Sequence, residues 1–146
     1  MSATAVGLEY LTVQDVLWIN LQATKRTNAF NYATLEEATF YQYGYGGSTD
    51  LLGQASRFLT GFLKKAPFGG HGDDVTAFLA THAFLAINGY DLEVPTEEYE
   101  SWIERVKSGQ IVAGEAITQL SKESGHGHAP SPIEAMRAAL AKYHVA

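Results

Sequence analysis

The sequence contains no cysteine, which excludes disulfide bonds and thiolate metal sites. A chain without cysteine is compatible with a reducing compartment, and we expect a cytoplasmic protein. Basic residues are also scarce: 10 Lys and Arg face 16 Asp and Glu, for a formal charge of −6. This balance argues against nucleic acid or an anionic membrane as the main partner.

Long apolar segments are lacking as well. The first nine residues have neither a basic start nor an apolar centre, so we predict no signal peptide. The longest apolar stretch, Val75 to Ile87, includes two threonines and His82 and is too short to span a bilayer. We therefore expect no membrane segment and interpret this stretch as a buried helix, with His82 as a hydrogen-bonded core residue.

The residues that are present indicate one globular domain. Of the 146 residues, 46% are hydrophobic and 18% are charged, a composition typical of a folded chain with a core. Helical spacing recurs throughout, and we expect extended pieces only at Gly7–Leu11 and Tyr90–Val94. The helices are predicted at residues 13–23, 34–43, 51–65, 73–88, 97–107, 113–122 and 132–143.

Capping residues mark the ends of several predicted helices. Thr12 with Asp15, and Ser131 with Glu134, have the spacing of capping boxes. The remaining predicted end signals are Ser48 or Thr49 before the third helix, Thr96 before the fifth, and Gly89 after the fourth.

The predicted helix at residues 73–88 is apolar on every side, which is typical of a central, fully packed element. We therefore predict an all-α fold, a helical bundle around this buried helix. Its domain would cover residues 1–123, and residues 124–146 would form a linker and an amphipathic helix. That last helix either packs on the body or offers its apolar stripe to a partner.

The most informative segment is the glycine-rich loop at residues 66–74, which reads A-P-F-G-G-H-G-D-D. Such a loop, followed by a helix N-terminus, offers unpaired backbone N–H groups to an anion, and Gly70 and Gly72 would contribute through their backbone alone. Its side chains oppose this use, because no Lys or Arg occurs between Ala66 and Glu104. Each aspartate would add a like-charge penalty of roughly 1 to 4 kcal/mol at about 4 Å.

Three side chains of this loop have alternative interpretations. Asp73 and Asp74 at a helix start favour the helix dipole and cap N–H groups. With His71 they also form a possible site for a divalent metal ion. His71 is, in addition, a candidate for a general base.

The order of these elements resembles the Fic/Doc (Fido) family, in its short death-on-curing branch. The likeness covers about residues 8–123. It is carried by L-T-V-Q-D at 11–15, the Pro67-Phe68 loop, T-A-F-L at 76–79, N-G-Y at 88–90 and E-R-V-K-S-G-Q-I at 104–111.

The resemblance implies a definite chemistry for active members of that family. They carry H-P-F-x-[DE]-G-N-[GK]-R before T-A and transfer an AMP or phosphate group from a nucleotide to a protein hydroxyl. Their histidine is the general base, their acid holds Mg²⁺, and their Asn, Arg and helix N-terminus bind the phosphates.

This chain departs from that motif at every chemical group. Ala66 stands in the place of the base, although Pro67, Phe68 and Gly72 match. The acid, Asn and Arg are replaced by His71, Asp73 and Val75 in one alignment of the loop, and by Gly70, Gly72 and Asp74 in the other.

The resemblance therefore implies the scaffold without its nucleotide-transfer activity. We expect a degenerate member that has no cofactor and acts through contacts with a protein. An antitoxin-like protein and a second copy of the chain are alternative partners. One alternative is a divergent nucleotidyltransferase or phosphotransferase that modifies a protein hydroxyl, uses His71 with Asp73 or Asp74, and requires ATP and Mg²⁺. Another is a small metal-binding protein with the same three residues.

Two further groups of residues have an ordinary explanation and a functional one. His126 and His128 lie in a glycine-rich stretch that we interpret as a solvated linker, although such a pair can bind transition metals. Tyr41, Tyr43 and Tyr45 follow Phe40, and we expect most of these rings to pack and some to form a contact surface.

Overall fold

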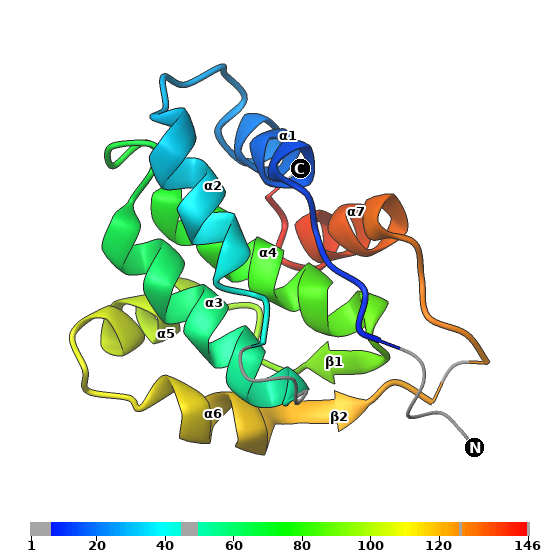
Figure 1. The fold of residues 1–146 in the computed structure, drawn as a ribbon. Coiled ribbons are helices and arrows are strands. Elements are labelled where there is room, and N and C mark those ends of the chain that lie inside the picture. Colours follow the sequence, from blue (N-terminus) through cyan, green and yellow to red (C-terminus); the bar gives the residue numbers. More distant parts are fainter. Residues whose placement is uncertain (1–6, 45–49, 126, 146) are drawn as a thin grey trace.

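The structure is a computed structural model that describes residues 7–44, 50–125 and 127–145. Its helices are α1 (Val13–Thr24), α2 (Tyr32–Phe40), α3 (Leu51–Lys65), α4 (Asp73–Ile87), α5 (Tyr99–Lys107), α6 (Ala113–Leu120) and α7 (Pro132–Lys142). Its strands are β1 (Tyr90–Leu92) and β2 (Ser121–Glu123) (Figure 1). The prediction of an all-α bundle is confirmed, with one small sheet added at its edge.

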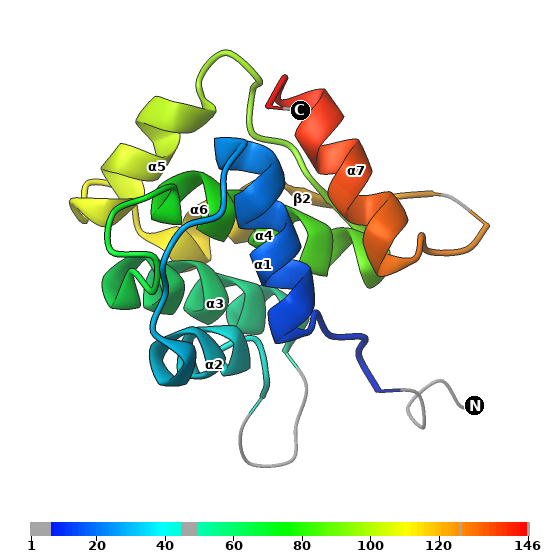
Figure 2. The same ribbon diagram turned by 90° about the horizontal axis from the view of Figure 1, so that it is seen from above.

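Helix α4 is the centre of the bundle, as its composition predicted. Every residue from Thr76 to Leu85 is buried. Helices α3, α7 and α1 pack against it from different sides, and α2 lies outside α3 (Figures 1 and 2). None of the helices in the described ranges has the length and apolarity needed to cross a membrane.

Both predicted capping boxes are present. The Thr12 hydroxyl accepts from the Asp15 amide at 3.0 Å, and the Asp15 carboxylate accepts from the Thr12 amide at 2.8 Å. Ser131 and Glu134 repeat this exchange at the start of α7. Four residues of sequence are enough to determine such a pattern, because both bonds join residues three positions apart.

Two other helix starts differ from the predictions by two residues each. Helix α2 begins at Tyr32, because the Asn31 side chain caps it by accepting from Thr34 N at 3.0 Å. Helix α5 begins at Tyr99 rather than Glu97, and the Thr96 hydroxyl bonds the Glu97 carboxylate instead of capping. Asp50 caps α3; the predicted caps Ser48 and Thr49 lie outside the described residues.

The end of α6 was predicted wrongly. The helix stops at Leu120 instead of continuing to Lys122, since Ser121 has extended backbone angles. Residues 121–123 form β2, which pairs antiparallel with β1 in the register Asp91 to Lys122. Tyr90–Leu92 lies within the predicted extended piece at 90–94, and its partner could not be identified because a three-residue strand has too little pattern of its own.

Helix α7 packs on the body of the bundle. Met136, Ala139 and Leu140 are buried in the core. Just past the helix, the Tyr143 hydroxyl donates to the carbonyl of Val94 at 2.8 Å, and burial raises the pKa of Tyr143 to about 12. The apolar stripe of α7 is therefore covered by its own chain except at Ile133, which is exposed.

Candidate functional site

The glycine-rich loop between α3 and α4 turns sharply at both of its ends. Helix α3 closes at Ala66, which has a left-handed φ of 45° and donates its amide to Phe62 O at 2.9 Å. Gly69, Gly70 and Gly72 then have φ values of 64°, 97° and 84°. Glycine adopts these angles at little cost, so the glycine run determines the shape of the loop.

Asp73 provides an internal anion for this loop. Its side chain is buried, with 4% of its surface exposed. One carboxylate oxygen accepts from the amide of Phe68 at 2.8 Å, and the other accepts from the amide of Gly70 at 2.6 Å. The position that the sequence suggested for a phosphate is therefore next to a carboxylate of the chain itself.

Two more amides of the loop are also paired. Gly69 N donates to Ala66 O at 3.0 Å, and His71 N donates to Phe68 O at 3.1 Å. Together with the two bonds to Asp73, this pairs the four consecutive amides from Phe68 to His71 within the loop. An external anion at these amides would have to displace the Asp73 carboxylate and would meet its charge.

A polar network that the sequence analysis did not identify joins this loop to α1. The buried Asn20 side chain donates to His71 O at 3.0 Å and to the Thr76 hydroxyl at 3.1 Å. Its own oxygen accepts from Asn28 Nδ2 at 2.9 Å. An asparagine within the apolar run of α1 was the available signal, because a buried amide requires several hydrogen-bond partners.

Gly72 is the residue that allows α1 and the loop to approach. A β-carbon at this position would lie 2.4 Å from Thr24 Cγ2 and 3.1 Å from Asn20 Nδ2. Its φ of 84° is also one that glycine adopts with least strain. The match of Gly72 to the family motif thus has a structural reason in this chain.

The second aspartate, Asp74, has a different environment. Its carboxylate forms an ion pair with Lys107 Nζ at 3.1 Å, and about 40% of each side chain is exposed. Hydrogen bonding to Asp74 raises the pKa of Lys107 above its ordinary value. The loop is therefore less negative than its sequence suggested, because folding brings a cation from α5 to the start of α4.

The three candidate metal ligands are not brought together. His71 is exposed, Asp73 points into the loop, and Asp74 pairs with Lys107. In the part of the chain that the structure describes, no three His, Asp or Glu side chains are arranged to share a metal ion.

The outer side of the loop borders two hollows. One has a volume of about 400 Å³ and a mainly apolar lining that includes Leu17, Trp18, Leu21, Arg26, Phe30 and Phe68. The other, of about 550 Å³, adjoins Phe30, Lys65, Ala66 and His71. The segment between α1 and α2 runs beside the loop, where Asn31 N donates to Pro67 O at 3.4 Å (Figure 2).

Phe30 lines both hollows and is 41% exposed. Its ring lies 6.0 Å from that of Phe68, which is buried and belongs to the loop. Leu21, at the rim of the first hollow, is 38% exposed. We call the lining of the first hollow, Leu17, Trp18, Leu21, Arg26, Phe30 and Phe68, the Phe30 surface.

The aromatic cluster after α2 is more exposed than expected, because Tyr43 is exposed like Phe40 and Tyr41 is half-buried. The Tyr41 hydroxyl donates to Glu37 at 3.1 Å, and the Tyr43 ring lies 4.2 Å from that of Tyr10. Phe40 is 48% exposed. Tyr45 lies outside the described residues.

No protein-family model, curated protein or solved structure matches this chain. The resemblance to the Fic/Doc family therefore stays a prediction that rests on the sequence motifs.

Proposed function

We propose that this chain is a degenerate Fic/Doc-like protein that binds another protein through the Phe30 surface and does not transfer nucleotides. The observation that carries the proposal is the buried carboxylate of Asp73, which accepts from Phe68 N and Gly70 N. These two amides are thereby occupied by the chain's own anion, and the phosphates of a nucleotide placed near them would meet the charge of Asp73.

The side chains around the loop support the same conclusion. Ala66, in the place of the base, has no group that can accept a proton, and loss of a general base costs about 10²- to 10⁴-fold in rate. Phosphoryl transfer also depends on cations that neutralise developing charge. Lys107 is paired with Asp74, and Lys65 is paired with Glu37 at 3.0 Å.

The Phe30 surface has the composition of a protein contact. Aromatic residues and arginine are enriched at the centre of protein interfaces, and this surface combines Trp18, Phe30 and Arg26. The hollow beside Phe30 suits one large apolar side chain of a partner, with an acidic group next to Arg26. The resemblance suggests an antitoxin-like protein as this partner.

Calorimetric titration with ATP and Mg²⁺ tests the first half of the proposal. We expect no measurable heat of binding, because the phosphates would compete with Asp73. Binding at micromolar strength or better would contradict the proposal and favour the divergent transferase. A parallel titration of Asp73→Asn, which removes the charge but keeps one acceptor oxygen, measures how far Asp73 itself opposes the nucleotide.

Retention of a co-purifying partner tests the second half. We expect Phe30→Ala to lose the partner, because the mutation removes a ring that lines both hollows. Val112→Ala is the matched control, since Val112 is 59% exposed and lies just before α6, away from this surface. Equal retention by both variants would contradict the assignment, and self-association that depends on Phe30 would identify a second copy as the partner.

A further inference from the structure

His82 lies on α4, where α7 packs against that helix. Its side chain is buried, with 6% of its surface exposed. Neither ring nitrogen has a hydrogen bond of normal distance and angle among the described residues. A buried imidazole in this state is unusual, because buried polar groups are nearly always bonded. The expectation of a hydrogen-bonded core histidine is therefore wrong for the described residues.

The packing beside the ring is uneven. The rings of Tyr143 and Phe78 lie 5.5 and 6.3 Å from the imidazole. On another side a hollow of about 540 Å³ extends between α4 and α7, because the side chains at positions 86, 135 and 138 are alanines. The ring nitrogens themselves are closed off while α7 is in place. Removal of α7 would open this side of the ring to water.

Helix α7 is an element that can leave without dismantling the rest of the bundle. Its capping box, between Ser131 and Glu134, is local to the helix. The connection from β2 leads round to its start, and the described residues 124–125 and 127–131 of that connection are mostly exposed. Helix α3 packs on the other side of α4 (Figures 1 and 2). The contact between α3 and α4 therefore does not depend on α7.

The contacts that hold α7 are mainly apolar. Two polar links to the body come after the helix: the Tyr143 hydroxyl donates to Val94 O at 2.8 Å, and Lys25 Nζ donates to Val145 O at 3.0 Å. The Tyr143 hydroxyl keeps its proton throughout the acid range, since its pKa is raised to about 12. These links therefore leave His82 as the candidate for an acid-sensitive group under α7.

The surroundings of the ring oppose its protonation while α7 is docked. Burial, and then the charge of Lys142 on α7, lower the pKa of His82 to about 4, whereas the nearby backbone of Leu92 acts in the opposite direction. An imidazolium in this position would be a buried charge with no hydrogen-bond acceptor of normal geometry among the described residues. Such a charge is costly until water or a counter-charge reaches it.

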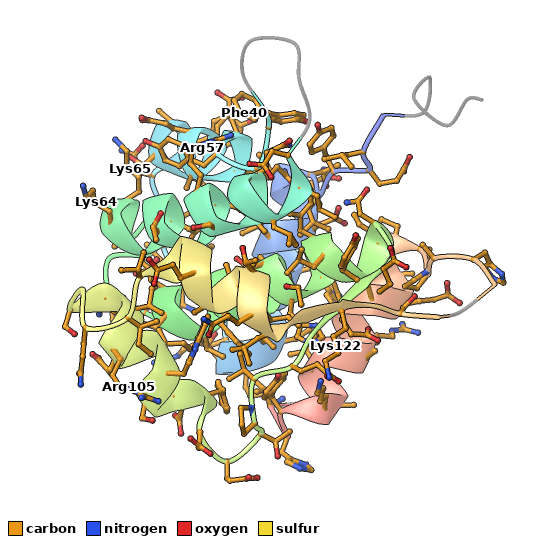
Figure 3. All side chains as sticks on the ribbon, turned by 90° about the horizontal axis from the view of Figure 1, so that it is seen from below. Phe40, Arg57, Lys64, Lys65, Arg105 and Lys122 are labelled. Atoms are coloured by element: carbon orange, nitrogen blue, oxygen red, sulfur yellow. The ribbon has the colours of Figure 1, made fainter. Side chains whose placement is uncertain are left out.

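Other titratable groups near the ring come from several elements. Asp91 of β1, Glu134 of α7 and His128 line the hollow. Tyr99 of α5 belongs to the aromatic cluster, with its ring 5.1 Å from that of Tyr143. The cations of α3, among them those labelled in Figure 3, lie on the other side of α4 from α7. His128 is therefore the group whose titration has to be separated from that of His82.

We propose that acid releases α7 from the bundle through protonation of His82. The imidazolium is buried without a full partner between α4 and α7, and it gains water when α7 leaves. Release would expose the apolar stripe of Met136, Ala139 and Leu140, which the sequence analysis considered as a surface for a partner. This device is separate from the Phe30 surface and does not depend on the proposed protein-binding function.

The pH range of the release follows from proton linkage. The pKa of His82 is about 4 with α7 docked, and it returns to about 6.5 once the ring is in water. The released form therefore binds the proton more tightly and is favoured as the pH falls below 6.5, with little further gain below 4. The equilibrium constant for opening of α7 should increase about 20-fold between pH 7 and pH 5.

Hydrogen exchange of the full chain, followed by nuclear magnetic resonance at pH 7 and pH 5, tests this proposal. Protection factors compare each amide with its own intrinsic rate at the same pH. We expect the amides of α7 to be less protected than the core amides of α3 at both pH values, and to lose about 20-fold in protection at pH 5. Equal protection of α7 and α3, or protection of α7 that does not change with pH, would overturn the proposal. This comparison uses the wild-type chain alone.

Matched variants assign the effect to one histidine. His82→Phe should abolish the pH-dependent loss of protection in α7, because phenylalanine takes up no proton, and His82→Leu provides a second uncharged variant of different shape. His128→Gln is the control and should retain the loss, since His128 lines the same hollow from an exposed position. A loss that persists without His82, or that disappears in His128→Gln, would overturn the role of His82.

Discussion

Two buried polar side chains of α4 have opposite environments. At its N-terminal end, both oxygens of Asp73 accept from backbone amides, and Asn20 nearby bonds to the loop and to Thr76. Further along the helix, His82 has no full hydrogen bond among the described residues and borders a hollow. The polar side chains at the first end have their hydrogen-bond partners within the chain, whereas the buried imidazole of His82 has none of normal geometry among the described residues.

The two ends of α4 also differ from what their sequences suggest. The glycines and the helix start suggest an anion site in the sequence, yet Asp73 occupies two of the loop's donors, the amides of Phe68 and Gly70. His82 lies within an apolar stretch that predicts a hydrogen-bonded core residue, yet its buried ring nitrogens have no hydrogen bond of normal geometry among the described residues. The comparison can be tested at each end separately.

Replacing Asp73 by alanine should have the largest effect. Two charge-assisted hydrogen bonds would be lost and the amides of Phe68 and Gly70 left unpaired, so we expect a loss of about 3 to 5 kcal/mol in unfolding free energy. Urea denaturation measures this directly. Asp74→Ala is the control and should cost under about 1 kcal/mol, because its ion pair is exposed; similar losses in both variants would contradict the role of Asp73.

Gly72→Ala should cause the second-largest loss of unfolding free energy. The new β-carbon would lie 2.4 Å from Thr24 Cγ2 at a φ of 84°, so we expect a loss of about 2 to 4 kcal/mol from clash and strain together. Gly69→Ala also has a positive φ but meets nothing within 4 Å, and it should cost only about 1 to 2 kcal/mol. Equal melting temperatures for the two variants would show that the approach of α1 does not depend on Gly72.

The pH dependence of stability should report on His82. The pKa of His82 is lowered to about 4 in the folded protein. Its contribution to the free energy of unfolding is therefore fully present above the pKa of the unfolded chain, near 6.5, and is lost as the pH falls towards 4. The loss should be about 3 kcal/mol for this residue. Urea denaturation of the wild type and of His82→Phe between these pH values measures this loss as the difference between the two proteins. If the free energy of unfolding changed with pH in the same way in both, the lowered pKa would be contradicted.

The ion pair between Lys107 and Asp74 should have the smallest effect. Both side chains are about 40% exposed, so a double-mutant cycle should give a coupling below about 1 kcal/mol that decreases with added salt. A larger, salt-independent coupling would mean that α5 is needed to hold the start of α4 in place.

Much of the fold follows from local sequence patterns. The capping boxes at Thr12 and Ser131, and the uniformly apolar helix at 73–88, predicted helix starts and the central element correctly, because caps and helical faces depend on residues a few positions apart. The extended end of α6 was missed, since Ser121–Glu123 takes its conformation from pairing with β1. The sequence identified the loop of the candidate site and its glycines, but it did not identify the groups that Asp73 and Asp74 bind.

Composition and spacing therefore account for the helices, the burial of α4 and the glycine-dependent turn before it. Tertiary structure alone decided that Asn20 would bond to a carbonyl 51 positions away, that Lys107 would reach Asp74, and that alanines on two helices would leave a hollow at His82. Hydrogen bonds, ion pairs and cavities between distant segments depend on how whole helices are placed, and no local pattern encodes that placement.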